Sequence, residues 1–400
     1  MNRVSLGVYI SVPFCRTKCS YCNFASDVFS RAVFERYVDR VCADIANAPT
    51  AAEEIGGRMD REVDSIYLGG GTPTVLDADQ LQRMFDAVRA QFSVTHDAEV
   101  TVECAPGTLK PDVLETLLNC GVNRVSLGVQ SFIDAEAAAV GRLHKRSTIL
   151  DDISRLRGAG ITNINVDLIA GLPHQTAESW RESLDQVIAT AAPHVSVYML
   201  EVDEDSRLGR EVIAGGTRYH AHFVPDEEAV ADFYGTACEA LEGAGVAQYE
   251  ISNFARGGFE SRHNLKYWTR QPYLGFGVDA HSMLLSATVE AEAARFSTAD
   301  ALEKYVAGSP LQTTLVTPAN ALEEIFFLGL RLNRGVDVRA VAPLCTPEES
   351  QLLQTIVGEL VSDGLLEEHG DCVRLSSRGR LLSNEVFQRF LAPAAPSAKA

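Results

Sequence analysis

The thiols of Cys15, Cys19 and Cys22 fall within eight residues, directly after a short apolar run over 7–12. A structural zinc site usually takes four protein ligands, and no further cysteine or histidine follows closely enough to complete one locally. A four-iron cluster held by three thiolates instead leaves one iron open to a small molecule. The Cys-x3-Cys-x2-Cys spacing therefore favours an iron–sulfur cluster, with zinc and unligated thiols as the alternatives.

Polar and glycine residues follow other apolar runs in the first half of the chain. A glycine run, Gly69 to Gly71, comes before Thr72 and Pro73, and glycine lets the backbone approach a ligand closely because it has no Cβ. Glu103 ends another run, and an acid is costly to bury there without a partner, such as a ribose hydroxyl or an ammonium group. Since functional groups collect at the carboxyl ends of parallel strands, we expect these residues to share one site.

The elements that must position these residues alternate between short β-branched runs and segments with helical spacing. This alternation predicts parallel strands with helical crossovers, and near-continuous apolar strands fit a sheet that is covered on both faces or curled into a barrel. We predict an α/β fold with a partial (β/α)6-type TIM-like barrel. Its six strands are expected at 7–12, 65–68, 99–103, 124–129, 163–169 and 195–202.

Four regions are expected along the chain. They are the barrel over 1–225, a barrel-packing extension over 226–310, a C-terminal winged-helix-like α+β domain over 311–391 and a disordered tail over 392–400. Residues 310–400 contain eight basic and eleven acidic side chains, so this part carries no basic stripe for nucleic acid.

The composition limits the class of protein further. The 400 residues carry a net charge of −19, which disfavours a nucleic-acid partner. There is no apolar run long enough to cross a membrane and no visible secretory signal, so we expect a cytoplasmic protein. In a reducing compartment the six other cysteines are expected to pack as small hydrophobic side chains.

Four motifs in order resemble the radical S-adenosylmethionine (SAM) superfamily and, within it, the oxygen-independent coproporphyrinogen III oxidase-like family. They are YISVPFC at 9–15, GGGTPT at 69–74, GVQSF at 128–132 and DLIAGLP at 167–173. The resemblance implies a 4Fe–4S cluster on the three cysteines, SAM, and an electron donor for the cluster. Arg142 could otherwise be a solvated cation, and Gln130 and Asp167 could cap loops. The resemblance implies these SAM-site residues: Tyr9, Tyr21, Gly70, Gly71, Thr72, Glu103, Gln130, Arg142 and Asp167.

Two features distinguish this chain from the oxidases. Phe24 stands where they carry a fourth cysteine, which argues against oxidative decarboxylation of coproporphyrinogen III, the alternative function. The sequence HNLKYW at 263–268 resembles the HNxxYW signature of the HemW-type haem chaperone branch. The resemblance implies that haem binds there and passes to an acceptor protein, which can be membrane-bound and met peripherally.

The hexapeptide is compatible with haem, because imidazole is a good axial ligand and aromatic rings offer flat surface to a porphyrin. A histidine beside aromatic residues is, however, more often a hydrogen-bonded structural residue. We expect Lys266 and Arg270 to offset the negative charge of haem, and His281 is a weaker rival ligand. The expected haem contacts are His263, Tyr267 and Trp268.

Overall fold

Six parallel strands follow one another in the sheet in chain order, and each predicted run falls on one of them. The computed structural model describes residues 5–288 and 290–391. Strand β1 also pairs with β10 (Tyr273–Gly277), and β7 pairs with β9 (Asn253–Ala255), so the two ends of the series do not pair with each other. The predicted partial barrel is confirmed. Its strands are β1 (Leu6–Val12), β3 (Glu62–Gly70), β4 (Ser93–Cys104), β5 (Arg124–Gln130), β6 (Asn163–Ala170) and β7 (His194–Met199).

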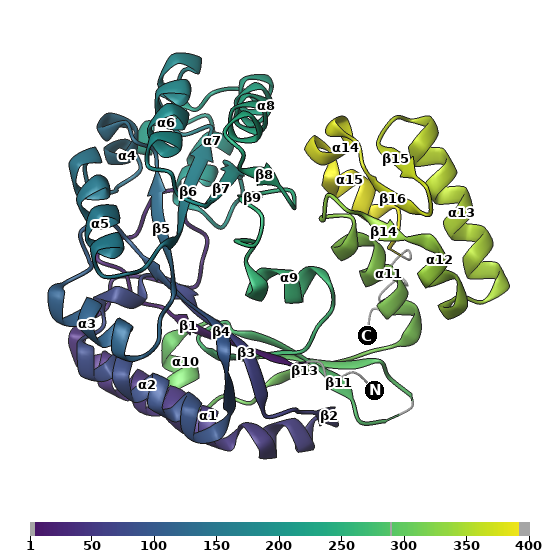
Figure 1. The fold of residues 1–400 in the computed structure, drawn as a ribbon, viewed down its shortest axis with the longest axis horizontal. Helices are drawn as coiled ribbons and strands as arrows, with labels where there is room; N and C mark the ends of the chain where they lie inside the picture. The colour runs from purple at the N-terminus through teal and green to yellow at the C-terminus, as the bar shows by residue number, and fades with distance from the viewer. Residues whose placement is uncertain (1–4, 289, 392–400) are drawn as a thin grey trace.

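Helices connect these strands and cover the outside of the curved sheet (Figure 1). Helix α1 turns Val38, Val41 and Ile45 inward at helical spacing, and all three are fully buried. A capping box between Asp77 and Gln80 starts α2. The helices are α1 (Phe34–Glu54), α2 (Ala78–Gln91), α3 (Pro111–Asn119), α4 (Asp134–Ala139), α5 (Arg146–Gly158) and α6 (Ala177–Ala189).

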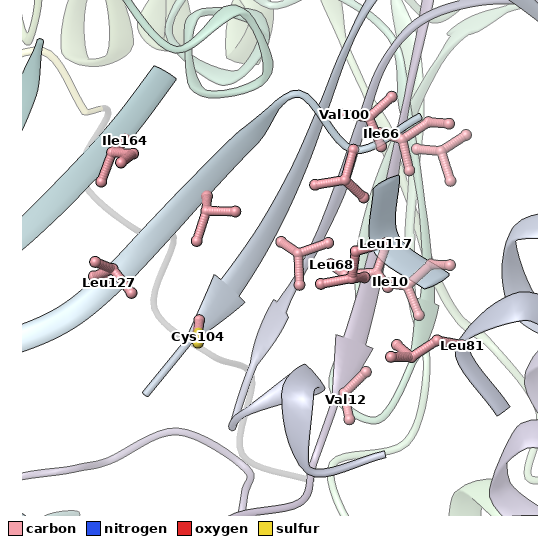
Figure 2. Packing of buried hydrophobic residues seen from close by; sticks show 14 of the residues in the cluster. Ile10, Val12, Ile66, Leu68, Leu81, Val100, Cys104, Leu117, Leu127 and Ile164 are labelled. Atoms are coloured by element: carbon pink, nitrogen blue, oxygen red, sulfur yellow. The ribbon is translucent and has the colours of Figure 1, made fainter. Parts of the chain in front are cut away.

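The main hydrophobic core lies between the sheet and these helices. Figure 2 shows Leu68 and Val100 on the sheet packing towards Leu81 of α2 and Leu117 of α3. The expectation of near-continuous apolar strands is wrong, because the apolar positions that face the helices alternate with inward positions that are mostly polar, Ile169 being an apolar exception. The inward positions carry polar side chains, and the register places them opposite one another: Tyr67 and Thr101, Glu103 and Ser126, Asp167 and Ser196.

The middle of the chain extends the sheet and fills the lower end of the barrel, which is the end where the parallel strands begin. Six antiparallel pairings add strands beside β10 and β7, and α9 lies between the barrel and the C-terminal region in Figure 1. The elements are β2 (Gly57–Arg58), α7 (Arg207–Ile213), the 3-10 helix η3 (Arg218–Phe223), α8 (Glu227–Gly243), β8 (Ala247–Gln248), α9 (Arg262–Trp268), β11 (His281–Ser286), β12 (Ala293–Ser297), α10 (Leu302–Val306) and β13 (Gln312–Val316).

The C-terminal region has its own core and a three-stranded sheet in the order β14-β16-β15. Phe326 stacks on Phe390 with ring centroids 4.8 Å apart. The predicted tail, 392–400, lies outside the described residues. None of the described helices is long and apolar enough to cross a membrane. The elements are α11 (Pro318–Gly329), β14 (Val336–Asp337), α12 (Val338–Val341), α13 (Pro347–Ser362), β15 (Leu366–His369), β16 (Cys372–Leu375), α14 (Ser377–Leu381) and α15 (Ser383–Gln388).

Candidate functional site

The cluster loop, defined here as residues 15–26, leaves the carboxyl end of β1 and folds back on itself. The Cys15 amide donates to the Asp27 carbonyl at 3.0 Å, and the Asp27 amide donates to the Pro13 carbonyl at 2.9 Å. Inside the loop, Lys18 Nζ donates to the carbonyls of Phe24 at 2.7 Å and Ser26 at 2.6 Å. These bonds define the loop without any contribution from its thiols.

The three thiols are free and close enough to influence one another. Burial raises the pKa of Cys15, hydrogen bonds from Ser26 and Thr72 lower it, and the neighbouring Cys22 and Cys19 raise it. No group of three or more metal-ligating side chains in the described chain could hold a metal ion. A four-iron cluster does not need ligands gathered around one ion, because it binds each thiolate on a separate iron. A cation is already in place, because Arg142 Nη1 donates to Cys19 Sγ at 3.7 Å.

The predicted glycine loop packs directly against the cluster loop. The Gly71 amide donates to the Val12 carbonyl at 2.7 Å, and the Thr72 amide donates to the Phe14 carbonyl at 2.8 Å. A Cβ on Gly71 would lie 2.7 Å from the Phe14 carbonyl oxygen and 3.1 Å from Cys15 Sγ. Gly70 has a φ of 97°, which only glycine adopts readily. Glycine is therefore required here for two separate reasons, close approach and backbone conformation.

Glu103 points into the barrel beside the glycine loop. Its Oε1 accepts a hydrogen bond from Tyr67 Oη at 2.8 Å and would lie 2.9 Å from a Cβ on Gly69. Burial and then the charge of Asp167 raise the pKa of Glu103 to about 7, although hydrogen bonds from Tyr67 and Gly70 lower it. The carboxyl is therefore poised to become charged when a cation or hydroxyl donor binds.

The side chains of Gln130 and Arg142 both lie close to Gly128. A Cβ there would lie 2.5 Å from Arg142 Nη2 and 3.1 Å from Gln130 Nε2. Both side chains keep a buried polar atom without a hydrogen bond, Oε1 of Gln130 and Nε of Arg142. Gln130 also has a φ of 70°, an uncommon conformation for a residue with a side chain. An acceptor and a donor left unpaired beside the cluster loop suit a polar ligand.

Asp167 belongs to a polar network inside the barrel that sequence reasoning missed. Asn165 Nδ2 donates to Asp167 Oδ1 at 2.7 Å and to Ser196 Oγ at 3.0 Å, and Ser126 Oγ donates to Asp167 Oδ2 at 3.2 Å. Burial raises the pKa of Asp167, and the hydrogen bonds from its neighbours lower it. Alternating polar residues within the strands were the signal that could have revealed this inner face.

The remaining predicted SAM-site residues lie on two sides of these groups. The Tyr9 ring is 6.1 Å from that of Tyr67, and it lines a cavity of about 270 Å³ together with Gly70 and Gly71. Burial raises the pKa of Tyr21, and the charge of Arg142 lowers it. Cys19 and Cys22 also raise this pKa, so Tyr21 lies beside these cysteines of the cluster loop. The fold thus gathers the residues predicted for SAM around the cluster loop, the glycine loop and the adjoining inner face of the barrel.

His263 lies at the other end of the barrel, where α9 begins. Its Nδ1 is 3.0 Å from Ser65 Oγ and its Nε2 is 2.8 Å from Tyr267 Oη, so both ring nitrogens are engaged. The side chain is 1% exposed, and burial, together with the charge of Lys266, lowers the pKa of His263 to about 3. An iron could reach this imidazole only after one of the two hydroxyl groups moved away.

The other residues of the motif point in different directions. Tyr267 lines the 270 Å³ cavity with Phe24 of the cluster loop and with His281. The fold therefore brings together three residues that the sequence linked to haem binding or to the difference from the oxidases. Trp268 instead packs under Arg331, whose guanidinium carbon is 4.3 Å from the ring centroid.

The expected counter-charges for haem are already paired within the protein. Lys266 Nζ lies 2.7 Å from Asp64 Oδ1, and Arg270 Nε lies 2.9 Å from Glu324 Oε2. The side chain of Lys266 is 2% exposed and that of Arg270 is 16% exposed, so neither presents an open cation to a ligand.

Comparisons with known proteins agree with this arrangement. The radical SAM superfamily matches residues 9–187, and the HemN C-terminal domain matches residues 316–382. The solved structure of Escherichia coli coproporphyrinogen III oxidase (HemN), a radical SAM enzyme, superposes with a TM-score of 0.81 at 24% identity. It covers 97% of this chain and 90% of that one. At this identity the likeness shows the fold alone, whereas the superfamily match over residues 9–187 identifies a radical SAM protein.

The curated relatives narrow the family. "Heme chaperone HemW" of Bacillus subtilis is 34% identical over 96% of this chain and 98% of its own length. "Heme chaperone HemW" of Escherichia coli is 30% identical over 97% of this chain and 98% of its own. The chain therefore belongs to the HemW family of the radical SAM superfamily, as its motifs predicted.

Proposed function

We propose that this protein is a cytoplasmic haem chaperone that binds a 4Fe–4S cluster, SAM and haem and passes haem to an acceptor protein. The observation that carries the proposal is similarity over almost the whole chain to relatives named for this role. Phe24 in the cluster loop, where the oxidases have a cysteine, supports a carrier over a decarboxylase. The electron donor of the cluster and the haem acceptor are partners of the proposed cycle.

The residues present fit a cluster and SAM. Cys15, Cys19 and Cys22 would hold the cluster, and Arg142 beside Cys19 would offset part of the thiolate charge. When bound, such a cluster supplies one electron and an open iron coordination position. Gln130 Oε1 and Arg142 Nε have no other partner, so they would orient the polar groups of SAM.

The carboxyl groups of Glu103 and Asp167 would contact SAM in different ways. Glu103 would accept hydrogen bonds from ribose hydroxyls or an ammonium group, and its raised pKa means that the ligand must help to hold the charged form. Asp167 is already held by Asn165 and Ser126, so it would present a fixed acceptor. We propose that the motif at 263–268 closes the lower end of the barrel and presents Tyr267 to the cavity behind Phe24.

The proposal is tested by titrating the anaerobically reconstituted protein with ferric haem. A stoichiometric change in the Soret band is expected, and its absence would reject the carrier role. In a second arm the protein is incubated with coproporphyrinogen III, SAM and a reductant. Accumulation of protoporphyrinogen there would identify an oxidase instead.

A further inference from the structure

A second cavity, of about 550 Å³, lies on the outer side of the cluster loop between the end of α4, α7 and η3. Ligand pockets typically measure roughly 300–1,000 Å³, so this one has the size of a cofactor site. Ser20 of the cluster loop lines it, is 4% exposed, and has an Oγ without a hydrogen-bond partner. The loop is tied to the opposite wall, because the Leu208 amide donates to the Ser20 carbonyl at 2.8 Å.

Two imidazoles face this cavity, those of His220 and His222. His220 Nδ1 lies 3.0 Å from His174 Nε2. In the tautomer that donates from His220 Nδ1 to His174 Nε2, the Nε2 of His220 keeps a free lone pair and is available as a ligand. A histidine that ligates a metal commonly has its second ring nitrogen held in this way, which fixes the ring orientation.

The cavity also carries unpaired positive charge. Lys18 and Arg207 line it, and neither forms an ion pair with a carboxylate of the described residues. Their polar contacts are instead to backbone carbonyls of the cluster loop. This is the local positive charge that an acidic protein needs in order to attract an anion, and it is absent from the 270 Å³ cavity, whose lining contains no lysine or arginine.

Aromatic rings complete the surroundings. The guanidinium carbon of Arg207 lies 5.4 Å from the centroid of Tyr219, and the ring of Phe223 is 4.0 Å from that of His222. Tyr219 and His220 both have positive φ angles, 53° and 60°, and two successive non-glycine residues in this conformation are unusual. Such strained residues tend to gather at ligand sites. Tyr219 and Phe223 are exposed, so a ligand held here could be handed on without opening the barrel.

We propose that this cavity is the haem site, with His220 Nε2 as the iron ligand and Lys18 and Arg207 contacting the propionates. The assignment rests on the proposed haem-carrier function and locates its cargo. An imidazole, two cations and a flat aromatic surface together match a planar anionic iron porphyrin. The site adjoins the cluster loop through Lys18 and Ser20, and it lies apart from the buried His263.

The test is a ferric haem titration of the full-length, cluster-reconstituted protein and its variants. His220→Ala should raise the Kd for haem at least tenfold and alter the Soret band. Free imidazole should restore the wild-type band, because it can enter the space that the side chain has left. His174→Ala should weaken binding by roughly tenfold, as loss of an outer partner does. His96→Ala, at an exposed histidine of β4 outside both cavities, is the matched control and should bind like wild type.

A second pair of measurements tests the cations. The wild type should bind ferric haem more tightly than the dimethyl ester of haem, which has no propionate charge. Arg207→Gln should reduce this preference, and iron and sulfide contents check that the cluster loop survives. Failure of the wild type to bind haem would reject the proposed function itself. If the wild type binds and His220→Ala binds equally well, or if only His263→Gln or His281→Ala abolishes the band, the assignment of this site is wrong.

Discussion

The Glu103 carboxyl is predicted to destabilise the ligand-free protein at neutral and alkaline pH. Its pKa rises from the ordinary value of 4.5 to about 7, because burial and the charge of Asp167 disfavour the carboxylate. A raised carboxyl pKa stabilises the folded state fully below pH 4.5, and this contribution is lost as the pH rises through about 7. The free energy of unfolding should therefore fall across this window.

The substitution Glu103→Gln removes the charge and keeps an acceptor for Tyr67. Each pH unit of pKa difference corresponds to about 1.4 kcal/mol, which sets an upper limit of about 3 kcal/mol on the gain in stability. The carboxyl lies in an open barrel, so screening by water should reduce the gain to about 1–2 kcal/mol. The same variant should bind SAM less tightly, since the charged acceptor is lost. Stability and ligand binding are thus expected to change in opposite directions.

The assay is urea unfolding of the ligand-free wild type and variant at about pH 5 and about pH 8.5, on either side of the shifted pKa. The two proteins should have similar stability at the lower pH, and the variant should be more stable at the higher pH. Glu115→Gln, at an exposed carboxyl of α3, serves as the control and should show no such pH-dependent gain. An equal difference at both pH values, or a less stable Glu103→Gln at high pH, would refute this account of the site.

Three further predictions concern the loops and the lower end of the barrel. Replacing any cysteine of the predicted cluster by alanine should sharply lower iron and sulfide content after reconstitution, whereas Cys104→Ala, outside the loop, should not. Gly71→Ala should destabilise the protein by about 1–3 kcal/mol and reduce iron content, since its Cβ would overlap the Phe14 carbonyl. Gly158→Ala, with no atom within 4 Å of the added Cβ, should be neutral or slightly stabilising in the same urea assay. Lys266→Met should lower the free energy of unfolding by about 1–3 kcal/mol, because Asp64 loses its 2.7 Å partner and keeps only Arg262 at 3.7 Å, and an unchanged free energy of unfolding would mean that this ion pair is not needed.

The fold class and the cluster loop followed from the sequence because their signals are local. Three thiols within eight residues of one loop stay close together whatever the rest of the chain does. The alternation of strand-like runs and helical segments likewise predicts parallel strands, whose carboxyl ends must meet at one edge. Gly70, Glu103 and Gln130, expected at strand ends, lie at or next to the last residues of β3, β4 and β5, while their role in binding SAM stays a prediction. The polar inner face was not predicted, because each run was interpreted from its apolar residues and the polar residues that alternate with them were overlooked.

The tertiary structure decided which polar side chains are free to bind a ligand. His263 looks like an available imidazole in the sequence, but Ser65, 198 residues away, and Tyr267 occupy its ring nitrogens. Lys266 likewise looks like a free cation in the sequence, but in the structure it forms an ion pair with Asp64. Conversely, Lys18 and His220 come together only because α7 and η3 pack on the cluster loop. Residue type and local spacing determine what a side chain can do, whereas its burial and its partners come from segments far apart in the chain, which only the folded structure brings into contact.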